Sequence, residues 1–148
     1  MIIAVNTKIP GKGSMARNEN FIVETFSRII SLHTQHTFIL IGEKKPSESF
    51  GASQNIIHEV IGLQGVGSAK WYLLFNIKIN AILKKHKADF FISYGFGSPG
   101  TKVPQCIIDP DLSCIHFPGL FKRTHLLFYK SFISRSIKKS KSLVVFSQ

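Results

Sequence analysis

The sequence predicts a three-layer α/β domain in which a mostly parallel sheet is covered by helices on both faces. Short runs of β-branched and aromatic residues alternate along the chain with longer segments whose apolar residues recur at helical spacing. The short runs are almost continuously apolar, which is typical of strands that a parallel sheet buries on both faces. The 148 residues match the size of one ordinary domain, so we expect a single unit that spans residues 1–148.

The first half of the chain is expected to supply three strands and one helix. Residues 1–5 are apolar and β-branched, which predicts a buried first strand. A glycine-rich loop is expected to follow up to residue 19, and Asn20 is expected to cap a helix that continues to about Leu32. Residues 37–41 and 56–61 predict the second and third strands, because β-branched residues in both runs are bounded by polar or glycine-containing segments.

The second half of the chain is expected to add two helices and three strands. Residues 70–86 form the clearest helical pattern, and their basic end suits the negative pole of the helix dipole. The apolar runs at 89–93 and 103–108 predict two strands, with Pro104 at the start of its strand or on a sheet edge. A long helix is predicted from Phe121 to about Lys139, followed by a last strand at 142–146.

The chain carries a formal charge of +11, and the positive charge is concentrated toward its C-terminal end. All eight acidic residues lie at or before Asp111. The cations that follow are Lys122, Arg123, Lys130, Arg135, Lys138, Lys139 and Lys141. Such a field favours anionic partners, namely nucleic acid, phospholipid head groups or phosphorylated sugars. A solvated helix face is the alternative interpretation of the same charges.

Cysteine usage and the N-terminal residues indicate a cytoplasmic protein without a metal or cofactor. Cys106 and Cys114 are expected to be plain thiols, and no Cys or His pair stands at the spacing of metal ligands. The apolar N-terminal run is too short for a signal peptide and has no basic region before it. No apolar run approaches the roughly 18 residues that a membrane-spanning helix needs.

Ligands of parallel α/β sheets bind beyond the C-terminal ends of the strands. Asn6 and Thr7 follow the first predicted strand, Tyr94 follows the fourth, and Asp111 and His116 follow the fifth, so we expect them to face one cleft. The two carboxylates of the Asp-Pro-Asp triplet at 109–111 have the chemistry to bind a metal or a sugar hydroxyl, or to act as acid and base. An Asx-turn is the alternative for this triplet.

The loop after the first strand is a candidate phosphate site. Gly11, Lys12, Gly13 and Ser14 precede a helix, and backbone N–H groups in such a loop can hold a phosphate. The loop matches neither the G-x-G-x-x-G nor the G-x-x-x-x-G-K-[ST] pattern, so a plain turn is the alternative.

Seven segments, taken in order, resemble the N-terminal domain of bacterial retaining glycosyltransferases of family 4, which have the GT-B fold. These segments are 2–7, 20–26, 36–39, 83–89, 101–105, 116–118 and 138–142. Their order and spacing carry the resemblance from end to end, since no single segment is specific. The resemblance implies a Rossmann-like domain that forms the acceptor-side half of a GT-B cleft. In that family a C-terminal domain with an E-x7-E signature binds most of the nucleotide-sugar, and we expect that domain to be absent here.

Two departures from the family pattern bear on catalysis. The family carries a G-x-G pair before the first helix, where Arg17, Asn18 and Glu19 stand here. A side chain there fills the space that a donor phosphate needs, and Glu19 repels it. The family also has a His-Asp pair after the fifth strand; Asp111 matches the Asp, but Pro110 replaces the His and has no imidazole. The resemblance therefore implies no confident catalytic residue, and we expect the 148 residues alone to be inactive.

The partners expected depend on which interpretation holds. With a C-terminal domain, the ligands would be a nucleotide-sugar and a sugar or lipid-linked acceptor. The main alternative is a non-enzymatic basic module that binds nucleic acid or an anionic membrane, the latter from the inner membrane face. A further alternative is a homodimer, because the face that meets a second domain would otherwise be exposed.

Overall fold

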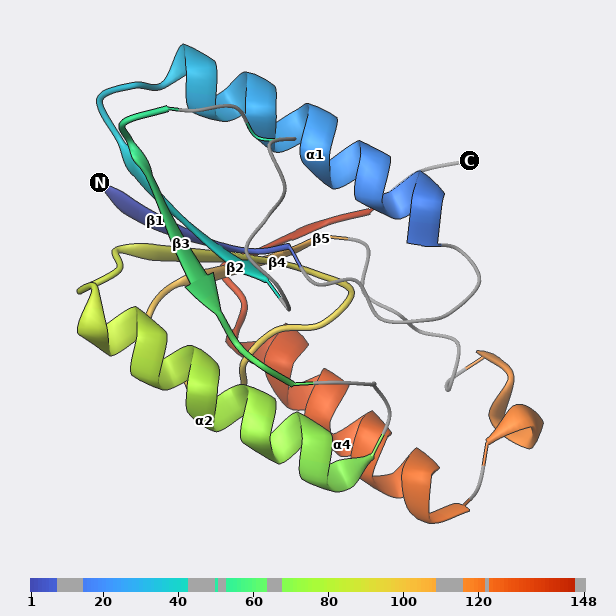
Figure 1. Ribbon diagram of the computed structural model, residues 1–148. Coiled ribbons are helices and arrows are strands. Elements are labelled where there is room, and N and C mark those ends of the chain that lie inside the picture. Colours follow the sequence, from blue (N-terminus) through green and yellow to red (C-terminus); the bar gives the residue numbers. More distant parts are fainter. Residues whose placement is uncertain are drawn as a thin grey trace.

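The computed structural model describes residues 1–7, 15–42, 50, 53–63, 68–108, 116–121 and 123–145, excluding the side chains of 15–19, 124, 125, 128 and 129. These residues form a six-stranded, all-parallel sheet with the strand order β3-β2-β1-β4-β5-β6. Helix α1 (Met15–Leu32) covers one face of the sheet, and helices α2 (Ala69–Lys85) and α4 (Arg123–Lys139) cover the other (Figure 1). The predicted three-layer, Rossmann-like α/β fold is confirmed.

The strands follow the predicted apolar runs closely. They are β1 (Ile2–Asn6), β2 (Thr37–Gly42), β3 (Ile56–Val60), β4 (Phe90–Tyr94), β5 (Gln105–Ile108) and β6 (Ser142–Val144). Strand β5 begins just after Pro104, whose carbonyl accepts a hydrogen bond from the N–H of Phe91 at 2.9 Å. Proline therefore stands at the strand start, where its missing N–H costs no ladder bond.

The sheet separates two layers of buried apolar side chains. On the α2 and α4 side, Ala4 and Phe91 lie in register on neighbouring strands and belong to the same buried cluster as Phe75 of α2. On the α1 side, Val5 and Leu40 are in register and pack in the cluster that contains the stripe of α1. The alternation of side chains along each strand explains why both faces of the central strands are apolar.

The connection from β4 to β5 contains no helix. Phe96 in this connection is completely buried and lies against three aromatic rings of α2, with centroid distances of 5.5 Å to Trp71, 5.7 Å to Tyr72 and 4.8 Å to Phe75. The loop thus covers the α2 side of the sheet with an aromatic side chain where a crossover helix would otherwise lie.

The predicted start of the first helix is wrong. Helix α1 begins at Met15, so residues 15–19, which were expected in a loop, are helical, and Asn20 is an exposed residue inside the helix. The physical reason is local propensity: Met, Ala and Arg at 15–17 are strong helix formers, and no glycine or proline follows Gly13 before the apolar stripe. The other element bounds differ from the prediction by one or two residues, which is the usual uncertainty of strand and helix ends.

Candidate functional site

The order of the sheet reverses at β1, which is where open α/β sheets bind their ligands. From β1 the chain adds β2 and β3 on one side and then returns to place β4 on the other side. Asn6, the last residue of β1, lies in register with Ser93, the residue before the end of β4, and the Asn6 amide donates a 2.9 Å hydrogen bond to Ser93 Oγ. Both side chains are buried, so this bond ties β1 to β4 beneath the carboxyl edge.

Thr7 secures the other side of the same edge. Its backbone N–H and its hydroxyl both donate to the carbonyl of Ile41, at 2.9 and 3.0 Å. Because Ile41 belongs to β2, these two bonds hold the ends of β1 and β2 together. Thr7 therefore lies where the sequence places it, and its hydroxyl is engaged in the sheet.

Tyr94 and Gly95 form the end of β4 and the turn after it. Tyr94 is buried in the cluster on the α1 side of the sheet. Gly95 has a φ of 78°, a conformation that glycine adopts without strain, and its N–H donates to the carbonyl of Ile108 at 2.8 Å. The structure thus brings Asn6, Thr7 and Tyr94 to one edge, with side chains that fix this edge.

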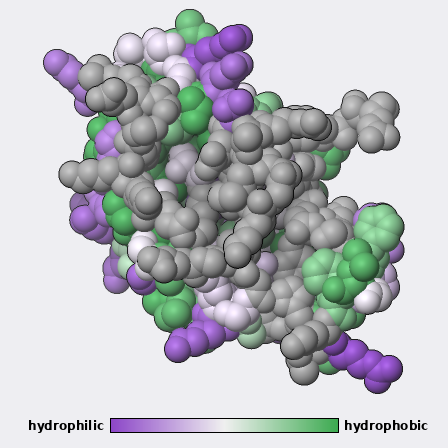
Figure 2. All heavy atoms as spheres, turned by 45° about the vertical axis from the view of Figure 1, so that its right-hand side comes forward, coloured by the Kyte–Doolittle hydropathy of each residue, from purple (hydrophilic) through white to green (hydrophobic). Residues whose placement is uncertain are grey.

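The remaining sequence candidates lie apart or outside the described residues. His116 is exposed, and its ring lies 6.5 Å from the ring of Phe117. Phe117 and Leu120 beside it are 61% and 81% exposed, and hydrophobic side chains form a patch at the lower right of Figure 2. The other candidates lie outside the described part of the chain; they are Gly11, Lys12, Gly13, Ser14, Pro110 and Asp111. The side chains of Arg17, Asn18 and Glu19 lie outside it as well.

A polar network between α2 and the β4–β5 loop was missed by sequence reasoning. The side-chain amide of Gln105 pairs with the backbone of Ser98, accepting from its N–H at 2.9 Å and donating to its carbonyl at 3.3 Å. The Ser98 hydroxyl donates to Asn76 Oδ1 at 2.7 Å and accepts from the amide of Asn80 at 3.1 Å. The one available signal was the spacing of Asn76 and Asn80, four residues apart on a mainly apolar helix.

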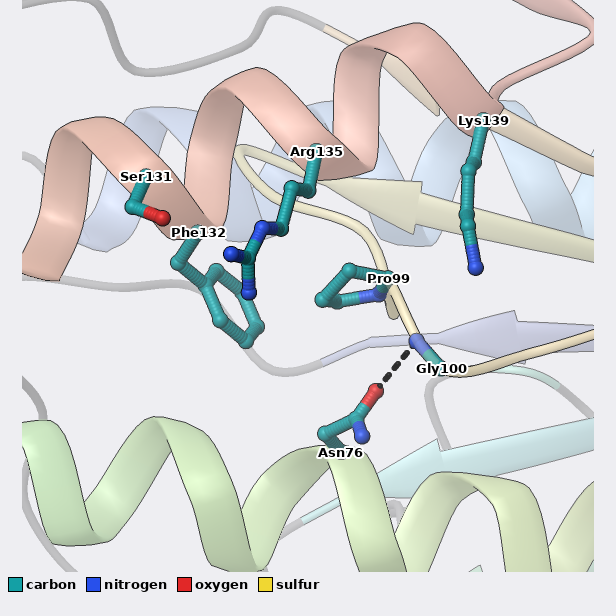
Figure 3. Close-up of a pocket in the computed structure, with 7 residues that line it drawn as sticks. All are labelled: Asn76, Pro99, Gly100, Ser131, Phe132, Arg135 and Lys139. Carbon is teal, nitrogen blue, oxygen red and sulfur yellow. Dashed lines mark hydrogen bonds between the residues drawn. The ribbon is translucent and has the colours of Figure 1, made fainter.

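Asn76 of this network also lines a groove of about 610 Å³ between α2 and α4. The groove is lined by Asn76, Pro99, Gly100, Ser131, Phe132, Arg135 and Lys139 (Figure 3). Arg135 extends from α4 toward the ring of Phe132, and Lys139 extends on the other side of Pro99, beside Gly100 (Figure 3). The arrangement offers two cations and several hydrogen-bond donors in one place, which is the chemistry that binds an anion.

An ion cluster lies at the far end of α2. The Glu59 carboxylate on β3 accepts a hydrogen bond from Lys85 Nζ at 2.7 Å, and His86 Nε2 lies 2.5 Å from the same oxygen. The hydrogen bond from Lys85, followed by that from His86, holds the pKa of Glu59 below its ordinary value of 4.5. This cluster fastens the edge strand β3 to the end of α2.

Metal binding and membrane spanning find no support in the described residues. Among them, no three His, Cys, Asp or Glu side chains come together where they could hold a metal ion. None of the described helices combines the length and the apolar character needed to cross a membrane.

The sequence matches no protein-family model, and a search of curated proteins finds no match. The resemblance to family 4 glycosyltransferases therefore supports a proposal and does not establish a family.

Proposed function

We propose that this chain is a Rossmann-like domain of glycosyltransferase type, which forms the acceptor-side wall of a cleft for sugar transfer. The observation that carries the proposal is the strand order, because it places the ends of β1 and β4 side by side at the reversal point of the sheet. The ordered resemblance of seven segments to family 4 enzymes supports the same function.

The hydrogen bonds at this edge suit the floor of a binding site. Ligand recognition requires groups whose positions are fixed before the ligand arrives. The bond between Asn6 and Ser93 and the two bonds from Thr7 to Ile41 fix three neighbouring strand ends. Glycosyl transfer needs donor and acceptor held together in one cleft. A domain that forms only one wall of the cleft is therefore tested by its sugar binding and not by transfer activity.

A thermal-shift screen with nucleoside-diphosphate sugars and sugar phosphates tests the proposal, and calorimetry then measures the affinity of each stabilising compound. Ser93→Ala removes one hydrogen-bond partner of Asn6 and so loosens a side chain that helps to fix the edge; we expect it to weaken binding about fivefold. Ser136→Ala is the matched control, since Ser136 is also buried but donates to Phe132 within α4.

Two results would count against the sugar-cleft proposal. The first is that no compound in the panel stabilises the protein. The second is that Ser93→Ala and Ser136→Ala change the affinity equally, because binding would then not depend on the carboxyl edge.

One observation favours a second candidate, a basic module that binds a polyanion in the cytoplasm. Lys130, Arg135, Lys138 and Lys139 are all exposed on α4, so their charges are available to solvent. Such binding would weaken steeply with added salt. Salt-sensitive association with DNA or with anionic vesicles, together with no sugar binding, would favour this module over the glycosyltransferase-type domain.

A further inference from the structure

We propose that the groove between α2 and α4 binds the phosphate group of a phosphorylated ligand. The groove shares no lining residue with the edge formed by β1 and β4, so this site is separate from the proposed sugar cleft. Its residues come from the middle of α2, from the β4–β5 loop and from the last turns of α4.

The two cations of the groove have no carboxylate partner among the described residues. Arg135 and Lys139 are one helical turn apart, and they extend from α4 on opposite sides of Pro99 (Figure 3). The described carboxylates are engaged elsewhere: Glu24 with Arg28, Glu59 with Lys85 and His86, and Asp89 with the backbone N–H of Ile2. No carboxylate in the described part of the chain therefore neutralises the positive charge in the groove.

The orientation of Asn76 adds a neutral donor to the same groove. Its Oδ1 accepts from the backbone N–H of Gly100 at 2.9 Å and from the Ser98 hydroxyl at 2.7 Å. Because a backbone N–H is always a donor, this contact fixes which side-chain atom is the oxygen. Asn76 Nδ2 is left without an acceptor among the described residues, and it lines the groove together with the Ser131 hydroxyl.

Gly100 lets the β4–β5 loop pass close to Asn76. A Cβ at this position would lie only 2.6 Å from Asn76 Nδ2, so no larger residue fits without displacing that amide.

A phosphate group matches the chemistry of this set of side chains. The guanidinium of Arg135 can bind two phosphate oxygens at once, and the ammonium of Lys139 adds a point charge. The volume of about 610 Å³ lies within the range of roughly 300–1,000 Å³ that small-molecule sites occupy, so it exceeds what one phosphate needs. Pro99 and Phe132 give the rest of the ligand an apolar wall.

The test is a titration of the isotopically labelled protein with pyrophosphate, followed by the amide signals. We expect saturable shifts centred on Gly100, Ser131 and Arg135. Replacing both groove cations, as Arg135→Gln with Lys139→Gln, should weaken binding about a hundredfold or more, since each lost hydrogen bond to a charged group weakens binding about tenfold or more. Gly100→Ala should weaken it as well, because the added methyl group displaces Asn76.

The matched control removes the same charges outside the groove. Arg123→Gln with Lys84→Gln also replaces one exposed arginine and one exposed lysine, at the start of α4 and near the end of α2. This control should keep nearly all of the affinity. Equal weakening by both double variants, or shifts spread over every basic segment, would overturn the proposal, because attraction would then be diffuse.

A second arm identifies the source of the phosphate group. Phosphatidylcholine vesicles with and without phosphatidic acid are sedimented with the protein, and pyrophosphate is added as competitor. A lipid head group is the source if the vesicles capture the protein only when they contain phosphatidic acid. That capture must also require Arg135 and Lys139, and added pyrophosphate must abolish it. Pyrophosphate binding in the groove without vesicle capture assigns a soluble phosphorylated compound. If the variant Arg135→Gln with Lys139→Gln still binds both pyrophosphate and the vesicles, the site is contradicted, whatever the outcome of the sugar screen.

Discussion

At the scale of single residues, close approaches between loop and strand determine which side chains this fold accepts. Gly97 is buried where the β4–β5 loop passes Gln105 and Ile107. A Cβ there would lie 2.5 Å from Gln105 Oε1 and 2.9 Å from Ile107 Cδ1. Nothing in the sequence near Gly97 reveals this contact, because it depends on how the loop folds back over β5.

Gly97→Ala is therefore expected to destabilise the protein by roughly 1–3 kcal/mol, the usual cost of overpacking a buried position. Urea unfolding measures the change in the free energy of unfolding. Gly119→Ala is the control, since a Cβ at Gly119 meets nothing within 4 Å, and its effect should stay within about 0.5 kcal/mol. Equal stability of the two variants would show that the loop does not pack against Gln105 in this way.

The candidate site was only partly predictable from residues. Asn6, Thr7 and Tyr94 could be placed at one edge because each directly follows an apolar strand, and parallel strands end at the same edge. The groove could not be predicted, since Asn76, Gly100 and Arg135 are far apart in sequence and meet only after α2, α4 and the loop have packed. Arg135 by itself looks like any other cation on a solvated helix.

At the scale of elements, the periodicity of apolar residues determines whether a segment is a strand or a helix. The residue at which an element begins or ends depends on the conformational preferences of the residues around it. The apolar runs predicted all six strands, and the helical stripes predicted α2 and α4 closely. The predicted start of α1 near Asn20 is wrong, because good helix formers precede Asn20 and the helix begins at Met15. A capping residue is informative only where the preceding residues disfavour helix.

The hydrogen bonds between β3 and the end of α2 predict a pH-dependent contribution to stability. The pKa of Glu59 is lowered in the folded protein, so its carboxylate stabilises the fold above the ordinary value of 4.5. This contribution is lost as the pH falls through the lowered pKa. Unfolding of the wild type and Glu59→Gln should therefore differ at pH 7 by up to about 1 kcal/mol, and the difference should vanish in acid.

Glu24→Gln serves as the control for this pH dependence. Glu24 and Arg28 are 3.9 Å apart, and their side chains are 72% and 79% exposed, so their pairing should add little at any pH. A difference between wild type and Glu59→Gln that is constant from pH 7 to acid would contradict the role assigned to Lys85 and His86.

At the scale of the whole molecule, the sequence predicted the layers but not the strand order. Alternating apolar strands and amphipathic helices require a sheet covered on both faces. Periodicity cannot tell which strand lies beside which, because β1, β2 and β4 are all apolar on both faces. The order β3-β2-β1-β4-β5-β6 comes from long-range packing, and it is this order that creates the reversal point.

The most direct test is to map where a sugar ligand binds. The labelled protein is titrated with glucose 6-phosphate and mannose 6-phosphate, which lack the nucleotide that the family's C-terminal domain binds. The background is Arg135→Gln with Lys139→Gln, so that the groove cannot capture the phosphate. We expect saturable amide shifts at Thr7 and Gly95, at the ends of β1 and β4. Shifts confined to Gly100, Ser131 and their neighbours, or no shifts at all, would contradict a sugar site at the reversal point of the sheet.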